Sequence, residues 1–305
     1  MRDAEGLTAG DIGVHAALFD LSRGRQALLS VAQPALGALL AAGRLPDARV
    51  VAVGLVAATA GYLAVFSLND VLDLHVDERA LAAGKDAAPT GDVDTVVLRH
   101  PLAQGVLSRT VALAWVGSLA AVALVGAAAL GGACVLAFAA AVALEVAYCA
   151  LRSVTWAKTF LSGAMVGIGG LAGWVAVAPL GIRALPFFAL LAAWEIAGRN
   201  LPNDLADIAA DSAVGLRTVA TTFGPRVSAD ASALGAYVTA AICLVLPAPP
   251  LLRVGALLCC TWSMAAPALG LASDPTPERA GSYFNRASLF PALAFAAALA
   301  GLLAR

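Results

Sequence analysis

The segment SLNDVLDLHVD, residues 67–77, ends a hydrophobic run that begins near Val50. It follows the pattern N-D-x-x-D-x-x-x-D, and the same pattern returns in NDLADIAAD at residues 203–211. The two copies contain, in order, Asn69, Asp70, Asp73 and Asp77, and then Asn203, Asp204, Asp207 and Asp211. The whole chain has only 20 acidic residues. We therefore interpret the two clusters as halves of one site and the rest of the chain as the scaffold that brings them face to face.

The composition indicates a membrane protein. Of the 305 residues, 61% are hydrophobic and 13% charged, and the mean hydropathy is +0.86. Soluble domains are roughly 45–50% apolar and about 25% charged. A chain of this length has too little interior to bury such an excess, so we expect contact with membrane lipid. The net charge of -1 excludes a basic nucleic-acid-binding protein, and nucleic acid is not an expected partner.

A membrane-spanning helix needs about 20 mostly apolar residues. Segments that meet or approach this length occur at roughly 26–42, 50–72, 110–130, 133–150, 159–179, 185–201, 231–246, 251–272 and 287–303. The predicted fold is one all-α domain over residues 1–305, a multi-pass transmembrane bundle of about nine helices. The N-terminal segment 1–22 is expected in the cytoplasm or, over the amphipathic residues 15–21, along the membrane interface. Residues 74–108 are predicted to form a long cytoplasmic loop over the site.

The spacing of the two clusters indicates their position in the membrane. They end the second and the sixth predicted spans, and an even offset puts them on the same side. This suggests two four-helix repeats in parallel orientation, followed by a ninth helix. If the N-terminus is cytoplasmic, most of the 19 Lys and Arg residues also face the cytoplasm, which is the usual bias. We therefore expect a protein of the cell (inner) membrane with both clusters on the cytoplasmic face.

The spacing within each cluster suits a metal. On an α-helix, Asp70, Asp73 and Asp77 lie within an arc of about 60°. Carboxylates held this close repel one another unless a cation lies between them. Mg²⁺ takes one or two carboxylates and completes its octahedron with water and substrate phosphates, so two opposed acidic faces suit Mg²⁺ and a diphosphate. The alternatives are solvated helix ends without a ligand, or a metal or lipid transporter.

Both motifs resemble those of the UbiA superfamily of intramembrane prenyltransferases. Three further segments are similar to family motifs in the same order along the chain. HPLAQGVLS at 100–108 is similar to R-P-L-x-x-G-x-x-S, and Tyr148 with Leu151 and Arg152 to Y-x-x-x-L-K/R. GLRTVATTFG at 215–224 is similar to G-x-x-T-x-x-x-x-x-G. The resemblance covers about residues 20–305.

The resemblance implies a bundle that opens to the cytoplasm and to lipid, and that transfers a polyprenyl group from its diphosphate to an acceptor, often an aromatic or quinone-precursor ring. It implies Mg²⁺ as the cofactor. The diphosphate ionises to an allylic cation, an electron-rich acceptor carbon attacks, and a base takes the released proton. The implied ligands of Mg²⁺ and diphosphate are Asn69, Asp70, Asp73, Asp77, Asp204, Asp207 and Asp211. Tyr148, Arg152 and Lys158 are implied to contact the diphosphate or to position the reacting carbon.

The chain departs from the family pattern near the first motif. His100 stands where the family usually has Arg, so its diphosphate contact is expected to be weaker or pH-dependent near the ordinary histidine pKa of about 6.5. A loop histidine without a role is the alternative. Residues 78–99 form a longer connection than usual, either a lid, an acceptor-selecting segment or a tolerated insertion. His75 points about 140° away from Asp70 and is expected on the flank.

A few other residues are candidates. Glu145 and Glu195 lie inside apolar spans, where a charge is costly, and should face the bundle interior or the site. Asn285 and Arg286 begin the last span and could face the cavity. The tryptophans are expected to be packing or interfacial residues, and Trp156, in an expected cytoplasmic loop, is the candidate exception. A membrane terpene cyclase with the same metal chemistry remains the alternative function, and the low aromatic content of 6% favours the transferase.

Overall fold

The computed structural model describes residues 13–82 and 98–304, and this part of the chain is helical without a strand. The first half contains α1 (Val14–Leu21), α2 (Gly24–Ser30), α3 (Ala32–Ala42), α4 (Ala48–Ala82), α5 (Arg109–Leu130) and α6 (Gly132–Leu151). The second half contains α7 (Lys158–Val175), α8 (Leu185–Trp194), α9 (Leu201–Ala206), α10 (Ile208–Val214), α11 (Val219–Phe223), α12 (Pro225–Cys243), α13 (Pro250–Cys260), α14 (Ala266–Ser273), α15 (Pro277–Ala287) and α16 (Phe290–Leu303). A 3₁₀ turn, η1 (Ile182–Ala184), and two π-helical turns, η2 (Glu195–Asn200) and η3 (Thr261–Ala265), link some of these helices.

Within the described residues, five helices are long and apolar enough to cross a membrane. They are Ala48–Ala82, Arg109–Leu130, Gly132–Leu151, Pro250–Ser273 and Pro277–Leu303. The all-α membrane fold is thus confirmed. The other expected spans are shorter, interrupted or less apolar helices, so the count of nine and the repeat stay predictions.

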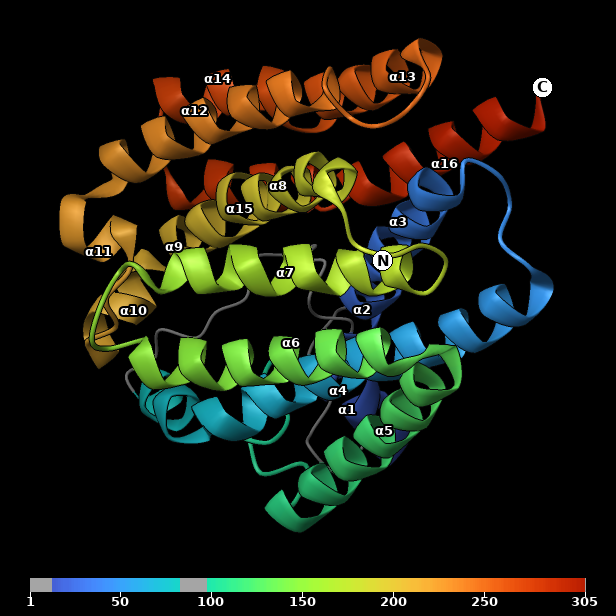
Figure 1. Cartoon of the computed structure of the whole chain (residues 1–305). Coiled ribbons are helices and arrows are strands. Elements are labelled where there is room, and N and C mark those ends of the chain that lie inside the picture. Colours follow the sequence, from blue (N-terminus) through green and yellow to red (C-terminus); the bar gives the residue numbers. More distant parts are fainter. Residues whose placement is uncertain (1–12, 83–97, 305) are drawn as a thin grey trace, which may run out of the picture.

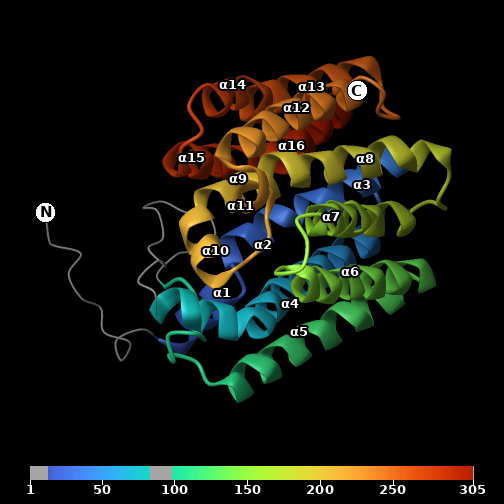
Figure 2. The same cartoon turned by 90° about the vertical axis from the view of Figure 1, so that its left-hand side faces the viewer.

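The long helices pack side by side as a bundle (Figures 1 and 2). Helix α5 packs along α4, α6 along α7, α3 between α7 and α16, α8 along α12, and α13 along α16. The contact between α3 and α7 is backbone to backbone. A Cβ atom at Gly173 would lie 1.8 Å from the Pro34 carbonyl oxygen, and one at Gly37 would lie 2.6 Å from the Gly170 oxygen. Small residues thus let these helices approach closely, as is common in membranes.

Proline explains where the predicted spans are interrupted. The expected first span at 26–42 is two helices, because Pro34 cannot donate to the Ser30 carbonyl and its ring clashes there. The π-helical turns η2 and η3 end just before Pro202 and Pro267, which likewise lack the backbone N–H. In both places the chain continues as a widened helix and does not break.

One sequence-based boundary is wrong. Residues 74–82 are not loop but the last turns of α4, since the chain has no Gly or Pro between Gly61 and Gly84. Residues 204–230 are mostly helical, and α11 within them begins at a reciprocal cap between Thr218 and Thr221. Helix α1 packs on the rest of the domain. Its Ala17 and Leu21 are fully buried against the loop before α5.

Candidate active site

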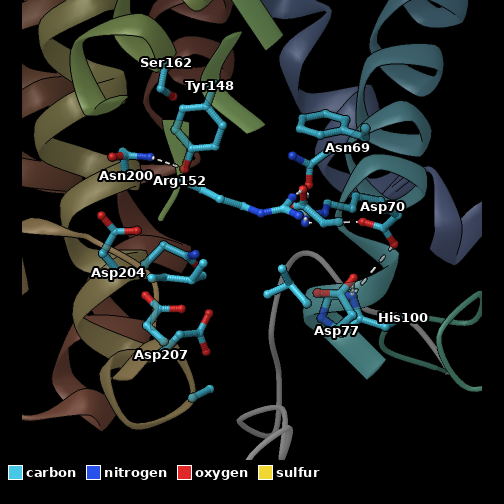
Figure 3. Close-up of a pocket in the computed structure, with 18 of the residues that line it drawn as sticks. Asn69, Asp70, Asp77, His100, Tyr148, Arg152, Ser162, Asn200, Asp204 and Asp207 are labelled. Carbon is cyan, nitrogen blue, oxygen red and sulfur yellow. Dashed lines mark hydrogen bonds and ion pairs between the residues drawn. The ribbon is translucent and has the colours of Figure 1, made fainter. Parts of the chain in front are cut away.

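A cavity of about 220 Å³ lies between the two acidic motifs. Figure 3 shows Asn69, Asp70 and Asp77 on one side of it and Asp204 and Asp207 on the other. The eleven site residues predicted from the sequence all line this cavity: Asn69, Asp70, Asp73, Asp77, His100, Tyr148, Arg152, Lys158, Asp204, Asp207 and Asp211. The tertiary structure therefore brings together the residues that the motifs singled out, from segments up to 142 positions apart (211 − 69).

The first motif lies on one continuous helix. Asp70 is buried, with 4% exposure, and its Oδ1 is 3.4 Å from Nη2 of Arg23. The same guanidinium donates to Asn69 Oδ1 over 3.2 Å. Asn69 in turn donates from Nδ2 to Glu145 Oε1 over 2.7 Å. Glu145 thus faces the site, as predicted from the cost of placing a charge inside a membrane span. It orients Asn69, the first residue of the motif.

The second motif does not lie on one helix. Helix α9 ends at Asp207, whose backbone leaves the helical region with φ -94° and ψ 11°. Asp211 therefore belongs to the next helix, α10. The expectation that its three acids share one helical face is wrong, because the chain turns in the middle of the motif. All three side chains still reach the cavity, which they enter from two helices.

Basic residues face the acids across the cavity. Arg152 forms an ion pair with Asp73, and Lys158 Nζ is 3.9 Å from Asp204 Oδ1. Lys158 also donates to the Tyr148 hydroxyl over 3.0 Å, and Asn200 Nδ2 donates to the same oxygen over 3.1 Å. The tyrosine is therefore held in one position by two donors. A diphosphate that entered would meet a fixed hydroxyl and two cations, which bind phosphate oxygens well.

One segment between α4 and α5 reaches both motifs. Arg99 Nη2 donates to Asp207 Oδ2 over 3.0 Å, while His100 Nδ1 lies 3.1 Å from Asp77 Oδ2 and 3.9 Å from Asp70 Oδ2. His100 has a positive φ of 51°, which is uncommon outside glycine. Burial alone would lower the pKa of His100, but the carboxylates of Asp77 and Asp70 raise it above its ordinary value. Arg99, one residue earlier, brings a guanidinium into the same cavity.

The donor set fits a hard cation such as Mg²⁺. Asp204 Oδ2 is buried, and no hydrogen-bond donor reaches it among the described residues. In the same part of the chain, no three acidic, histidine or cysteine side chains lie close enough to hold a metal by themselves. Mg²⁺ commonly takes only one or two carboxylates and completes its shell with water and phosphate. Asp70 and Asp204 are the most buried carboxylates of the two motifs and would be the first ligands.

Two carboxyl groups of the second motif, Asp204 and Asp211, have raised pKa values. Burial, and then the charge of Asp207, raises the pKa of Asp204 to about 6, against the lowering effect of Lys158. Burial and the charges of Asp204 and Asp207 raise the pKa of Asp211 to about 8. Near neutral pH this half of the site carries part of its protons. A divalent cation must displace them to bind.

An apolar chamber of about 660 Å³ adjoins the polar cavity. Its walls come from α3, α4, α6 and α7, and Leu28, Val51 and Leu55 at its margin are also exposed on the outer surface. Along α4 it extends from Phe66 to Val50, about 24 Å at 1.5 Å per residue. Phe66, Met165, Glu195 and Arg199 line both spaces. A ligand with a charged head and a long apolar tail would therefore fit across the boundary.

Other sequence candidates lie elsewhere. His75 is exposed and pairs with Glu78 over 3.2 Å, as expected for the flank. Arg286 does not line the cavity but lies over the ring of Trp262 at 4.3 Å. Trp156 packs edge-on against Phe160 and Phe223, so it is a packing residue. Most of the connection at 78–99, including any lid, lies outside the described residues.

Several polar cavity residues were not found from the sequence, among them Arg23, Arg99, Arg199 and Asn200. Arg99 directly precedes the HPLAQGVLS segment, and that position was the available signal. Arg23 lies 47 positions before Asp70. Nothing in its local sequence indicates the contact. Arg199 and Asn200 reach the cavity from the π-helical turn η2, which pattern reasoning on an ideal helix does not anticipate.

The comparisons with known proteins agree with this geometry. Residues 30–290 match the model of the UbiA prenyltransferase family. A search of curated proteins finds no match. Among solved structures, the apo UbiA homolog from Aeropyrum pernix K1 has a TM-score of 0.73 at 18% identity, over 90% of this chain and 98% of that one.

Two further solved structures are similar in fold. The UbiA homolog from Archaeoglobus fulgidus, bound to DMAPP and Mg²⁺, has a TM-score of 0.65 at 18% identity, over 92% of this chain and 99% of that one. A digeranylgeranylglyceryl phosphate synthase has a TM-score of 0.65 at 14% identity, over 95% and 98% of the two chains. At these identities the likeness concerns the fold.

Proposed function

Because the chain belongs to the UbiA prenyltransferase family, we propose that it moves a polyprenyl group from its diphosphate to an aromatic or quinone-precursor acceptor, with Mg²⁺ as cofactor. The observation that carries the proposal is the pair of acidic motifs facing each other across one cavity, with an apolar chamber opening from it. The UbiA homolog bound to DMAPP and Mg²⁺ has the same fold and supports this reading.

Arginine and lysine side chains of the cavity would bind the diphosphate. Arg152 and Lys158 enter from one side of the cavity and Arg23 and Arg99 from others, so phosphate oxygens would be met from several directions. Guanidinium groups bind phosphate in a bidentate way, and the lysine acts as a point charge. The Tyr148 hydroxyl, fixed by two donors, would position the oxygen that leaves. Mg²⁺, when bound by motif carboxylates, neutralises charge on the departing diphosphate.

The apolar chamber would hold the isoprenoid tail. Its length along α4, about 24 Å, exceeds half of the roughly 30 Å hydrocarbon core of a bilayer. This favours tails of several isoprene units over a single one, because each buried CH₂ contributes about 0.8 kcal/mol. The exposed margin at Leu28, Val51 and Leu55 would let the tail enter from the lipid.

The chamber lining also bears on the cyclase alternative. A cyclase must surround an internal cation with aromatic faces. Most of the chamber lining is aliphatic or small, with Tyr62, Phe66, Phe138 and Phe295 as its aromatic residues. This lining favours transfer to an external acceptor.

The deciding experiment uses purified protein in detergent or nanodiscs with Mg²⁺. Prenyl diphosphates of several lengths are added, with and without phenol and hydroquinone acceptors, and pyrophosphate release is measured. Release that depends on an acceptor supports transfer. Release without an acceptor, yielding a cyclic hydrocarbon, would support a cyclase. No turnover of any diphosphate, with Asp70→Ala and Asp204→Ala behaving like the wild type, would remove the enzyme proposal.

The membrane orientation is part of the proposal. The excess of Lys and Arg in loops on the motif side supports a cytoplasmic site in the cell (inner) membrane. Reporter fusions at the two termini test the topology. With about nine spans, the two ends should report opposite sides of the membrane.

A further inference from the structure

The boundary between the polar cavity and the apolar chamber carries one pair of charged groups. Four residues line both spaces, and among the described residues Glu195 and Arg199 are the two charged ones. The other two, Phe66 and Met165, are apolar. The acidic motifs lie in the polar cavity alone. Glu195 is therefore the carboxylate that stands between the space for a charged head and the space for an apolar tail.

The reacting carbon of the proposed substrate must lie at this boundary. In a prenyl diphosphate, C1 joins the diphosphate to the first double bond of the tail. If the diphosphate occupies the cavity and the tail occupies the chamber, C1 is located where the two meet. An acceptor that attacks C1 must bring its reacting atom to the same place. This step rests on the proposed function.

Glu195 is held in one position by two neighbours. Ser162 Oγ donates to its Oε1 over 2.8 Å, and Arg199 Nε lies 3.5 Å from its Oε2. The Arg199 guanidinium lies over the rings of Trp194 and Phe284, at 5.7 and 5.2 Å. Ser162 and Arg199 therefore fix the orientation of the Glu195 carboxylate at the boundary of the two spaces.

The local backbone aims this pair. Glu195 and Arg199 begin and nearly complete the π-helical turn η2, ahead of Pro202. Such turns are rare and often occur at functional sites. Arg199 is 7% exposed, and its Nε faces Glu195 Oε2 at 3.5 Å. The turn therefore directs the guanidinium and the carboxylate toward each other at the boundary of the two spaces.

The other buried glutamate is differently placed. Glu145 Oε1 accepts from Asn69, the first residue of the first motif, over 2.7 Å. It lines the polar cavity but not the chamber. Its position suits orientation of the first motif. Glu145 and Glu195 can therefore be compared directly, because both are buried and only Glu195 lies at the boundary.

We propose that Glu195 is the base that takes the acceptor's proton. The C1–O bond breaks, and its electron pair stays on the diphosphate oxygen. The acceptor carbon gives an electron pair to C1. The C–H bond at that carbon then breaks, its electrons restore the aromatic ring, and the proton moves to the Glu195 carboxylate. Ser162 and Arg199 act as positioning residues for that carboxylate.

The test compares Glu195→Gln with Glu145→Gln. Both changes keep the shape and hydrogen-bonding capacity of the side chain and remove its basicity. The probes are geranyl diphosphate, Mg²⁺ and hydroquinone or 4-hydroxybenzoate, each with hydrogen or deuterium on the ring. For Glu195→Gln we expect prenylation to fall about 100-fold or more. Affinity for geranyl diphosphate should be unchanged, and a ring-deuterium isotope effect absent from the wild type should appear because proton loss has become slow.

Glu145→Gln should give the opposite result. Geranyl diphosphate should bind more weakly, and no new ring-deuterium isotope effect should appear. Glu195→Asp should recover part of the rate without the isotope effect, and it serves as the second variant if Glu195→Gln does not fold. Turnover by Glu195→Gln at the wild-type rate, or a loss explained wholly by weaker diphosphate binding, would overturn the assignment. A wild type that turns over no acceptor would instead remove the proposed function, and this inference with it.

Discussion

The two acidic motifs have the same sequence pattern and different backbones. The first lies on α4, an uninterrupted helix of 35 residues. The second begins after the π-helical turn η2, loses its helix at Asp207 and resumes on α10. The same spacing of Asn and Asp therefore places the acids of the first motif on one face of a straight helix. It places those of the second motif along two short helices and the turn at Asp207 between them.

The difference extends to charge. In the first motif, each of the three acids lies within ion-pair distance of a basic side chain: Arg23, Arg152 or His100. In the second, Lys158 lies beside Asp204 and Arg99 beside Asp207, while no ion pair to Asp211 occurs within the described residues. Burial raises the pKa of Asp211 accordingly. Within the described residues, the two motifs therefore differ in one acid, Asp211, which has no basic side chain within ion-pair distance.

The largest loss of turnover is expected from changes at Asp70 and Asp204, the buried carboxylates at the same position of the two motifs. Asp70→Asn and Asp204→Asn each remove a buried carboxylate, and each should lower turnover more than about 100-fold, since even indirect partners of a metal are worth about 10–100-fold. Pyrophosphate release with Mg²⁺ measures it. The exposed Glu78→Gln on α4 is the control and should behave as wild type. If only one of the two Asp variants loses activity, the site is not shared between the motifs.

The next effect concerns the cations. Arg23→Gln and Arg99→Gln each remove a guanidinium that contacts one motif, and each should weaken geranyl diphosphate binding about 10-fold or more. A hydrogen bond to a charged group is worth about 1.5–3 kcal/mol, and 1.4 kcal/mol corresponds to a factor of ten. Titration calorimetry in the presence of Mg²⁺ measures the affinity. Equal affinity of Arg99→Gln and wild type would show that this arginine serves the fold and not the ligand.

The pH dependence of Mg²⁺ binding tests the second motif. Asp204 and Asp211, with pKa values raised to about 6 and about 8, must lose protons to bind a cation. Apparent Mg²⁺ affinity in the presence of pyrophosphate should therefore rise between pH 6 and 8, by up to about tenfold per proton released and per pH unit. Asp211→Asn should flatten the upper part of this rise. A flat profile in the wild type would contradict the raised pKa values.

The smallest effect concerns the π-helical turns. Pro202→Ala restores a backbone donor and should favour a regular α-helix, which would rotate Glu195 and Arg199 away from the boundary. Turnover should fall several-fold, while the protein becomes more stable by about 1 kcal/mol or less, a fraction of the roughly 3 kcal/mol by which Pro disfavours a helix. Pro267→Ala, at the turn η3 away from the cavity, is the matched control. It should raise the unfolding midpoint without changing turnover.

Sequence reasoning succeeded where the pattern was local and repeated. The two motifs were named from residue types and spacing, and the family resemblance added Tyr148, Arg152, Lys158 and His100; all lie in one cavity. It failed where the backbone departs from an ideal helix. The widened turn η2 precedes Pro202, and both η2 and the short helix α9 that ends before Asp207 pack against α12 and α15. A period of 3.6 residues does not represent these features.

The sequence by itself determined the class of protein and the chemistry of the site. Hydropathy requires helices in lipid, because backbone groups must be bonded internally there. Repeated carboxylates require a cation, because like charges repel. Only the tertiary structure decided which basic side chain pairs with which acid, and which glutamate lies at the boundary of the chamber. Arg23, Arg99 and Glu195 owe their positions to contacts between helices far apart in the chain, and no local pattern records such contacts.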